Sequence, residues 1–321
     1  MTKIVAFGGG HGLAASLRAL RALQRKKRED LDITAVVTVG DDGGSSGRLR
    51  ADRGIVPPGD IRQALAALAD ENDPAAGQTV ALLQHRFAGS DPLTGHPVGN
   101  LMLCGLMELL GDPVQAIDHV AAMVGATGRV LPMSCDPVWI EADVSGADGV
   151  ETTVRGQHNV AVAKGVVRTL RLNPSRPAPC AEAVAATKAA DWLIFGPGSW
   201  YTSVIPHLLV PELADAIAHS AARRLITLNL AVEQETSGLS LPDHLAALTR
   251  YLPGLRVDVV LADGNAIGAP EPVRRAAESL GAELVLAPVA VRGATTRHDP
   301  VALAAALEPI LSAERWSPPS A

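Results

Sequence analysis

A chain of 321 residues with 47% hydrophobic and 19% charged residues has enough apolar side chains for a packed core, which excludes a largely disordered protein. Its net charge of −6 argues against nucleic acid as the main partner, because phosphate backbones select basic surfaces. Only 3% of the residues are aromatic, so we expect a core of alanine, valine, leucine and isoleucine, typical of helices packed on a parallel sheet.

The cysteine content and the hydropathy pattern bear on the cellular compartment. Cys104, Cys135 and Cys180 are widely spaced and match no zinc motif, so we expect buried, reduced thiols and no metal site. No segment approaches the roughly 18 consecutive apolar residues that a membrane span needs. We therefore expect a cytoplasmic protein with no membrane span and no nucleic acid partner.

The N-terminal third alternates between strand and helix patterns. Residues 4–7 and 33–39 are short apolar runs typical of buried strands, and residues 13–24 between them have apolar side chains at helical spacing. Residues 3–40 therefore form a βαβ unit whose first strand is expected to lie centrally in a parallel sheet. Residues 59–124 are predicted to be mostly helical.

The middle of the chain differs from both ends. Residues 128–172 contain short strand-like runs separated by glycine, aspartate and proline, which predicts a small β-rich insertion. Alternation then resumes, with a helix at 181–190. Further strands are expected at 191–195, 225–228, 257–261 and 284–286. We predict one α/β domain over residues 1–321, with a doubly wound, mainly parallel sheet and a frayed tail at 314–321.

Glycines crowd the first turn between a strand and a helix. The segment Gly8-Gly9-Gly10-His11-Gly12-Leu13 lets the backbone approach a phosphate closely, and the start of the helix adds partial positive charge. The spacing differs from GxGxxG and there is no P-loop lysine, so a tight structural turn is the alternative. We predict that this turn binds a ligand.

Two further polar loops follow strands that end at the same edge of the predicted sheet. The first contains Asp41, Asp42, Gly43, Ser45 and Ser46, whose groups suit a ribose, a base edge, an oxyanion or a divalent metal, unless it is only a capped turn. The second is Gly196-Pro197-Gly198-Ser199 with Thr202 close behind. We predict that both contact the ligand.

Four single residues are candidates with an equally good structural explanation. Asp60 and Asn100 stand near helix starts, so each suits either N-capping or ligand contact. Asn229 ends a strand at the ligand-bearing edge, and Arg297 precedes the last helix, where it is suited to closing over a base or phosphate. No segment supplies a nucleophile with its base, so no catalytic residue is assigned from motifs.

Taken together, these segments resemble the YvcK family of gluconeogenesis factors, which is related to the CofD phospholactate transferases. The matching stretches lie in order along nearly the whole chain: Gly8 to Leu13, Val39 to Arg50, Pro57 to Arg62, Gly95 to Leu101, Gly128 to Pro132 and Gly196 to Pro206. The resemblance implies a Rossmann-like core that binds UDP-sugars, notably UDP-N-acetylglucosamine, and can accept NAD or NADP.

The resemblance also implies a biological role. Members of the family support cell shape and envelope, or peptidoglycan, synthesis during growth on gluconeogenic carbon, and are regulators rather than established enzymes. The implied protein partner is an enzyme of amino-sugar precursor synthesis, and a homo-oligomer is compatible with the sequence. The chain departs from the family at His11, where many members have threonine, and at 231–236, which forms a different pocket wall.

Two enzyme classes are the alternatives. In a CofD-like transferase, which moves phospholactate to a deazaflavin, Asp41 and Asp42 would hold Mg²⁺ or position the acceptor hydroxyl. This chain departs from the transferase pattern at 58–62 and 196–199, which favours the regulator. A nicotinamide-dependent oxidoreductase is disfavoured because the dinucleotide fingerprint has the wrong spacing.

Overall fold

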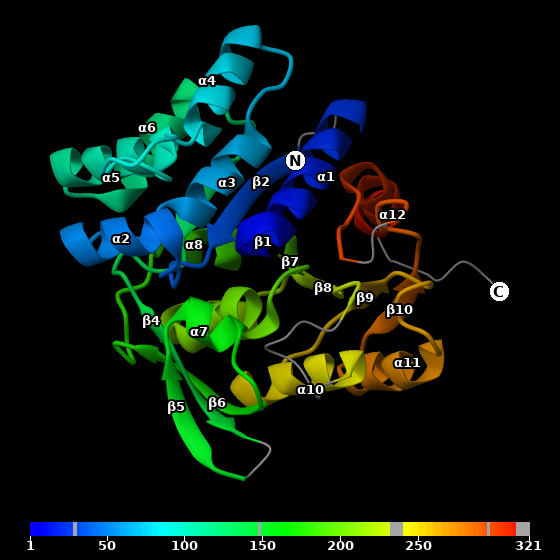
Figure 1. Cartoon of the computed structure of the whole chain (residues 1–321). Coiled ribbons are helices and arrows are strands. Elements are labelled where there is room, and N and C mark those ends of the chain that lie inside the picture. The colour runs from blue at the N-terminus through cyan, green and yellow to red at the C-terminus, as the bar shows by residue number, and fades with distance from the viewer. Residues whose placement is uncertain (28–30, 147–148, 232–239, 294–295, 313–321) are drawn as a thin grey trace.

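The computed structural model describes residues 1–27, 31–146, 149–231, 240–293 and 296–312 (Figure 1). The predicted frayed tail at 314–321, and all but the first residue of the altered segment 231–236, lie outside these residues.

A seven-stranded parallel sheet forms the centre of the molecule. Its order is β10-β9-β8-β7-β1-β2-β3. The chain therefore builds the sheet outward from β1 in one direction and then returns to the other side of β1, which confirms the doubly wound prediction. The strands are β1 (Thr2–Gly8), β2 (Leu31–Val37), β3 (Arg129–Pro132), β7 (Trp192–Phe195), β8 (Arg223–Thr227), β9 (Val259–Ala262) and β10 (Glu283–Leu286).

Helices cover both faces of this sheet. On one face α1 (Gly10–Lys27) packs against α3 (Gly59–Leu68) and α12 (Pro300–Ser312), as Figure 1 shows, and on the other α8 (Ala181–Ala189) packs against α9 (Pro211–His219). The predicted helical region 59–124 is confirmed. The remaining helices are α2 (Gly44–Arg53), α4 (Pro74–Gln84), α5 (Val98–Leu110), α6 (Pro113–Met123), α10 (Leu241–Tyr251) and α11 (Pro270–Ser279).

The insertion is a separate three-stranded antiparallel sheet with the order β5-β4-β6. It consists of β4 (Trp139–Ser145), β5 (Glu151–Arg155), the short helix α7 (Gln157–Ala161) and β6 (Val166–Asn173). The predicted boundary at 128 is wrong by one strand, because Val130 and Leu131 lie in β3 and pair with β2 of the main sheet. A four-residue apolar run has no feature of its own that tells which sheet it joins.

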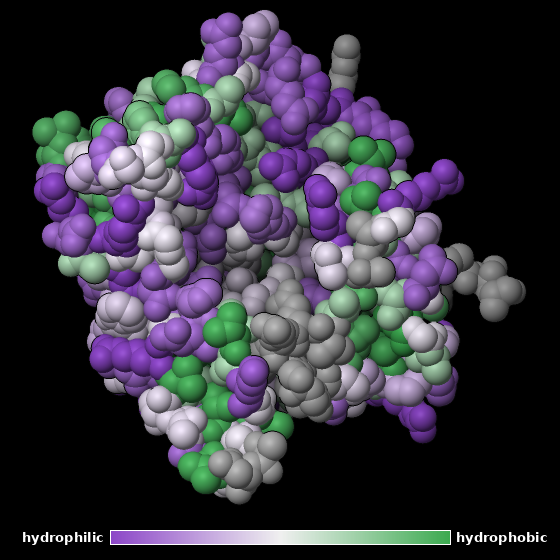
Figure 2. All heavy atoms as spheres, in the orientation of Figure 1, coloured by the Kyte–Doolittle hydropathy of each residue, from purple (hydrophilic) through white to green (hydrophobic). Residues whose placement is uncertain are grey.

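Aliphatic side chains make up most of the core, as the composition predicts. Among the buried aromatic side chains, Phe7 and Phe195 lie at the centre of the sheet, where they are register partners on β1 and β7 and stack with ring centroids 4.9 Å apart. Outside the core, hydrophilic side chains dominate the face seen in Figure 2, with hydrophobic groups over the antiparallel sheet. No helix among the described residues is long and apolar enough to cross a membrane.

Candidate functional site

Two glycine loops meet at the point where the sheet reverses its direction of growth. One follows β1 and leads into α1, and the other follows β7. A Cβ placed on Gly12 would stand 2.0 Å from the carbonyl oxygen of Pro197, so only glycine permits the observed approach of the two loops. Gly10 adopts a φ of 55°, which glycine accepts without strain. The glycines thus have a structural role in bringing the loops together.

A pocket of about 540 Å³ opens where these loops meet, at the carboxyl edge of the sheet. This is the position at which doubly wound proteins bind ligands, and the volume is in the range of small-molecule sites. The start of α1 borders the pocket. The lining residues are Gly9, Gly10, His11, Gly12, Ala161, Pro197, Gly198, Ser199, Ser203, Asn229, Leu230, Ala231, Thr296 and His298.

Asn229 holds the second loop in place. Its side-chain oxygen accepts a hydrogen bond from the amide of Gly198, and its side-chain nitrogen donates to the carbonyl of the same residue, both at 2.9 Å. Asn229 is buried, so each of its polar atoms needs this partner. Asn229, two residues after the end of β8, therefore sets the shape of the loop that follows β7.

A five-residue π-helix, η1 (Trp200–Val204), follows the second loop. It buries Trp200 and Tyr201 in the core, while Ser203 lines the pocket. The hydroxyl of Thr202 donates to the Ser199 hydroxyl at 2.6 Å, which orients that group at the pocket wall. Single π-helical turns are rare and frequent at functional sites, because they redirect side chains within a helix.

Of the residues predicted from sequence, eight line this pocket: Gly9, Gly10, His11, Gly12, Pro197, Gly198, Ser199 and Asn229. Arg297 lines a smaller adjoining hollow of about 180 Å³, which shares His11 and Gly12 with the pocket. Gly8, Gly196 and Thr202 lie behind the lining, and Leu13 is part of the core. The predicted loop after β2, residues 41–46, does not line the pocket. Its polar side chains are hydrogen-bonded to other parts of the protein instead.

The two adjacent carboxylates of that loop bind backbone amides. Asp42 accepts a hydrogen bond from the amide of His158 at 2.9 Å and so caps α7 of the insertion. Asp41 accepts from the amide of Gly43 at 2.9 Å, which closes a turn within the loop. Asp42 therefore joins the main sheet to the helix whose last residue, Ala161, lines the pocket.

Ser45 and Asn100 belong to a buried polar network. The Ser45 hydroxyl bonds to Nδ1 of His96 at 2.7 Å and accepts from the Asn100 amide at 3.0 Å. The oxygen of Asn100 in turn accepts from Nε of Arg62 at 2.9 Å, and burial lowers the pKa of this guanidinium to about 10. Every member has partners inside the protein, and the network joins α2, α3 and α5.

Asp60 lies beneath the first glycine turn. A Cβ on Gly9 would stand 2.5 Å from both the Asp60 carboxylate and the Thr38 hydroxyl, so the turn packs directly on these groups. The carboxylate accepts from the amide of Gly10 and from Thr38. Burial, and to a smaller extent the nearby Asp41, raises the pKa of Asp60 to about 7. Asp60 therefore positions the turn. Ser46 is buried close by, against Gly59.

Five lining residues lie outside the predicted loops: Ala161, Leu230, Ala231, Thr296 and His298. Thr296 and His298 flank the predicted Arg297, and Ala231 opens the altered segment 231–236. Ala161 comes from the insertion, and a lone alanine carries no signal in a sequence. Ser203 also lines the pocket and directly follows the predicted Thr202. A neighbouring hollow of about 670 Å³ shares Leu230 and extends along the same edge past Asp263.

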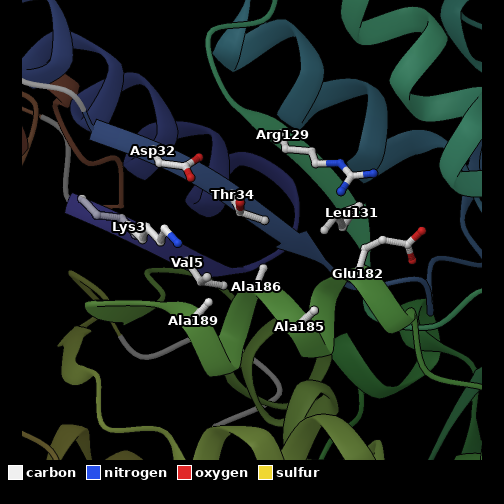
Figure 3. A pocket seen from close by; sticks show the side chains of 11 residues that line it. Lys3, Val5, Asp32, Thr34, Arg129, Leu131, Glu182, Ala185, Ala186 and Ala189 are labelled. Atoms are coloured by element: carbon white, nitrogen blue, oxygen red, sulfur yellow. The ribbon is translucent and has the colours of Figure 1, made fainter. Parts of the chain in front are cut away.

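Another hollow, of about 380 Å³, lies at the opposite end of the strands (Figure 3). Lys3 and Asp32 stand at one end of it and Arg129 and Glu182 at the other, with the alanines of α8 forming one wall. It contains none of the glycine loops. The pocket at the carboxyl edge is therefore the candidate site, and no group of three or more potential metal ligands occurs among the described residues.

Known proteins resemble this chain over most of its length. A family model described as 2-phospho-L-lactate transferase CofD matches residues 4–289. A Mycobacterium tuberculosis protein provisionally named a gluconeogenesis factor is 49% identical over 312 residues, which is 95% of this chain and 89% of its own length. The gluconeogenesis factor of Bacillus subtilis is 36% identical, with 85% of this chain and 81% of its own covered.

A solved structure resembles the whole fold. The crystal structure of a upf0052 family protein from Bacillus halodurans matches with a TM-score of 0.83 and 33% sequence identity. The match covers 96% of this chain and 99% of that protein.

Proposed function

The chain belongs to the CofD family, among the gluconeogenesis factors, and on that premise we propose that it binds a UDP-sugar at the pocket between the two glycine loops. The proposed ligand is UDP-N-acetylglucosamine. The proposed role is that of a cytoplasmic regulator that links gluconeogenic growth to cell-envelope synthesis and cell shape. Its proposed protein partner is an enzyme of amino-sugar precursor synthesis.

The observation that carries this proposal is the make-up of the pocket wall. Glycine backbone and the start of an 18-residue helix face a lining that contains no lysine or arginine among the described residues. Amide groups and the helix N-terminus suit a diphosphate without such cations. The hydroxyls of Ser199, Ser203 and Thr296 suit the many hydroxyls of a sugar. A sugar nucleotide needs both features side by side.

The same geometry supports a regulatory role. The titratable side chains of the described lining are His11 and His298, and no carboxylate stands within it. Asp42 instead caps α7, whose end lines the pocket. A ligand that contacts Ala161 therefore touches the insertion directly. The insertion is a candidate surface through which ligand binding is signalled to a partner protein.

The test is thermal unfolding with and without ligand. UDP-N-acetylglucosamine at about 100 times its dissociation constant stabilises the folded state by about 2.7 kcal/mol, which raises the midpoint by several degrees. UDP, N-acetylglucosamine, NAD, NADP and GTP serve as comparison ligands. No rise with UDP-N-acetylglucosamine at millimolar concentration would contradict the proposal.

A second candidate is a phospholactate transferase, favoured by the description of the matching family model. The discriminating measurement uses a deazaflavin acceptor with Mg²⁺ and a donor that carries lactate on guanosine diphosphate. Formation of phospholactyl-deazaflavin with release of GMP, and no thermal response to UDP-sugars, would establish the transferase. Asp41 and Asp42 are then the residues to replace first.

A further inference from the structure

Two cysteines lie at the junction between the insertion and the main sheet. The chain leaves the sheet after β3 and returns at the start of α8, and we call these two segments, residues 133–138 and 174–180, the neck. Within the neck Ser134 and Pro179 form an antiparallel bridge. Cys135 and Cys180 each follow one of these two residues, so they flank the bridge.

The backbone of the neck places both side chains on the same side of this ribbon. The amide of Cys135 donates to Ala178 at 3.2 Å, and the amide of Cys180 donates to Met133 at 3.5 Å. Side chains alternate along a strand, so the neighbours of a bridged pair share the opposite face from it. Diagonal neighbours of this kind are about 7–8 Å apart, slightly more than a disulfide spans, so the two segments of the neck must draw together a little on closure. The two thiols already hydrogen-bond to each other.

The two thiols are chemically unequal. Cys135 is partly exposed, whereas Cys180 is fully buried as the residue that precedes α8. Hydrogen bonding from Cys180 lowers the pKa of the Cys135 thiol, and the same interaction with burial raises the pKa of Cys180 well above its usual range. A thiolate is the reactive form of cysteine, so Cys135 is the group that meets an oxidant from solvent.

We propose that Cys135 and Cys180 form a peroxide-oxidised thiol pair that closes to an intramolecular disulfide across the neck. In the first step the Cys135 sulfur attacks hydrogen peroxide, which gives a sulfenic acid and one water. In the second, the Cys180 sulfur attacks the sulfenic sulfur while its proton passes to the departing hydroxyl, so that a second water leaves as the disulfide forms. Two thiols and one peroxide thus give one disulfide and two waters.

Two features of the chain favour this chemistry over other uses of the cysteines. No group of three or more potential ligands occurs among the described residues, so nothing completes a metal site around the pair. Cys104 on α5 is buried, and burial raises the pKa of its thiol, so it serves as an internal unreactive reference. Glu182, on the side of α8 shown in Figure 3, lies 3.5 Å from the Cys180 sulfur, and its charge raises the pKa of both thiols, so the hydrogen bond from Cys180 is what lowers the pKa of Cys135.

Closure of this disulfide ties the two ends of the insertion together. The enclosed loop contains β4, β5, α7 and β6, which lie below the main sheet in Figure 1. The cross-link removes loop-closure entropy from the unfolded chain, so the oxidised protein unfolds at a higher temperature. This inference does not depend on which ligand the pocket binds.

The test treats the full, pre-reduced chain with a small excess of hydrogen peroxide and then alkylates free thiols. We expect the intact mass to fall by two hydrogen atoms, one alkylated cysteine to remain at Cys104, and a non-reduced peptide map to join Cys135 to Cys180. A thermal midpoint a few degrees above that of the reduced protein, returned to its starting value by dithiothreitol, is expected as well. Alkylation of all three cysteines after peroxide, or disulfides between molecules only, overturns the proposal.

Matched serine variants separate the roles of the three cysteines. Cys104→Ser is expected to form the disulfide as the unmodified chain does. Cys180→Ser leaves the Cys135 sulfenic acid without its partner, so we expect sulfinic acid at Cys135 under the same peroxide treatment. Cys135→Ser is expected to leave Cys180 alkylatable after unfolding. Equal oxidation of Cys180 in that variant contradicts the proposed order of attack.

Discussion

The carboxyl of Asp60 beneath the first glycine turn makes stability depend on pH in a calculable direction. Burial raises its pKa from 3.8 to about 7, so the folded protein holds this proton more tightly than the unfolded chain. The contribution of Asp60 to the free energy of unfolding is therefore most favourable below about pH 4 and falls as the pH rises toward about 7. About three pKa units at about 1.36 kcal/mol each give a penalty of at most about 4 kcal/mol above that pH.

Asp60→Asn removes the charge and keeps the shape. The side-chain oxygen of the asparagine accepts from the Gly10 amide in place of the carboxylate, and its side-chain nitrogen donates to the Thr38 hydroxyl. The Thr38 hydroxyl then donates its own proton to the carbonyl of Gly8, which lies 3.5 Å away. We expect the variant to match the wild type near pH 4 and to exceed its free energy of unfolding by up to about 4 kcal/mol near pH 8.

Urea denaturation at a series of pH values measures this difference. Other groups titrate too, so the quantity of interest is the difference between the two proteins at each pH. Asp52→Asn, which removes an exposed carboxylate from α2, is the matched control and should follow the wild-type profile. Parallel profiles for Asp60→Asn and the wild type would refute the reasoning, because the carboxyl would then carry no burial penalty.

Three further substitutions test the site. Gly12→Ala puts a methyl group 2.0 Å from the Pro197 carbonyl oxygen, so we expect a lower thermal midpoint and no response to UDP-N-acetylglucosamine. Gly77→Ala in α4, which has open space around it, should retain the wild-type midpoint and the wild-type response. Asn229→Ala leaves the second loop without its two hydrogen bonds and should cost about 1–3 kcal/mol in chemical denaturation, and an unchanged ligand response would remove the loop from the site. Asp42→Ala removes the cap of α7 and should lower the free energy of unfolding by about 1 kcal/mol. Loss of protection from hydrogen exchange should be confined to α7, and protection equal to that of the wild type would contradict the capping role.

The thiol pair illustrates a limit of sequence reasoning. Wide spacing of Cys104, Cys135 and Cys180 predicts buried, reduced thiols, but only Cys104 and Cys180 are buried, and Cys135 is partly exposed. Only the bridge between Ser134 and Pro179 shows that two of them are neighbours. The insertion separates them along the chain, and no local pattern records that its two ends meet.

The strands, the helices and the glycine loops were predictable because their signals are local. Apolar runs, helical spacing and glycines at strand ends act over a few residues, and the rule that parallel strands end at one edge places their loops together. The doubly wound sheet and the meeting of residues 8–12 with 196–199 follow from these signals.

What each polar side chain does was decided by partners far away in the chain. Asp42 caps a helix 116 residues further on, Asn100 reaches back 55 residues to Ser45, and Asp60 lies under a turn 50 residues before it. A carboxylate or amide has the same appearance in a sequence whether it faces a ligand or a backbone amide. The amino-acid sequence by itself determined the sheet and its loops, and tertiary packing decided which groups face the pocket, because a buried polar atom must bond to whatever the fold brings beside it.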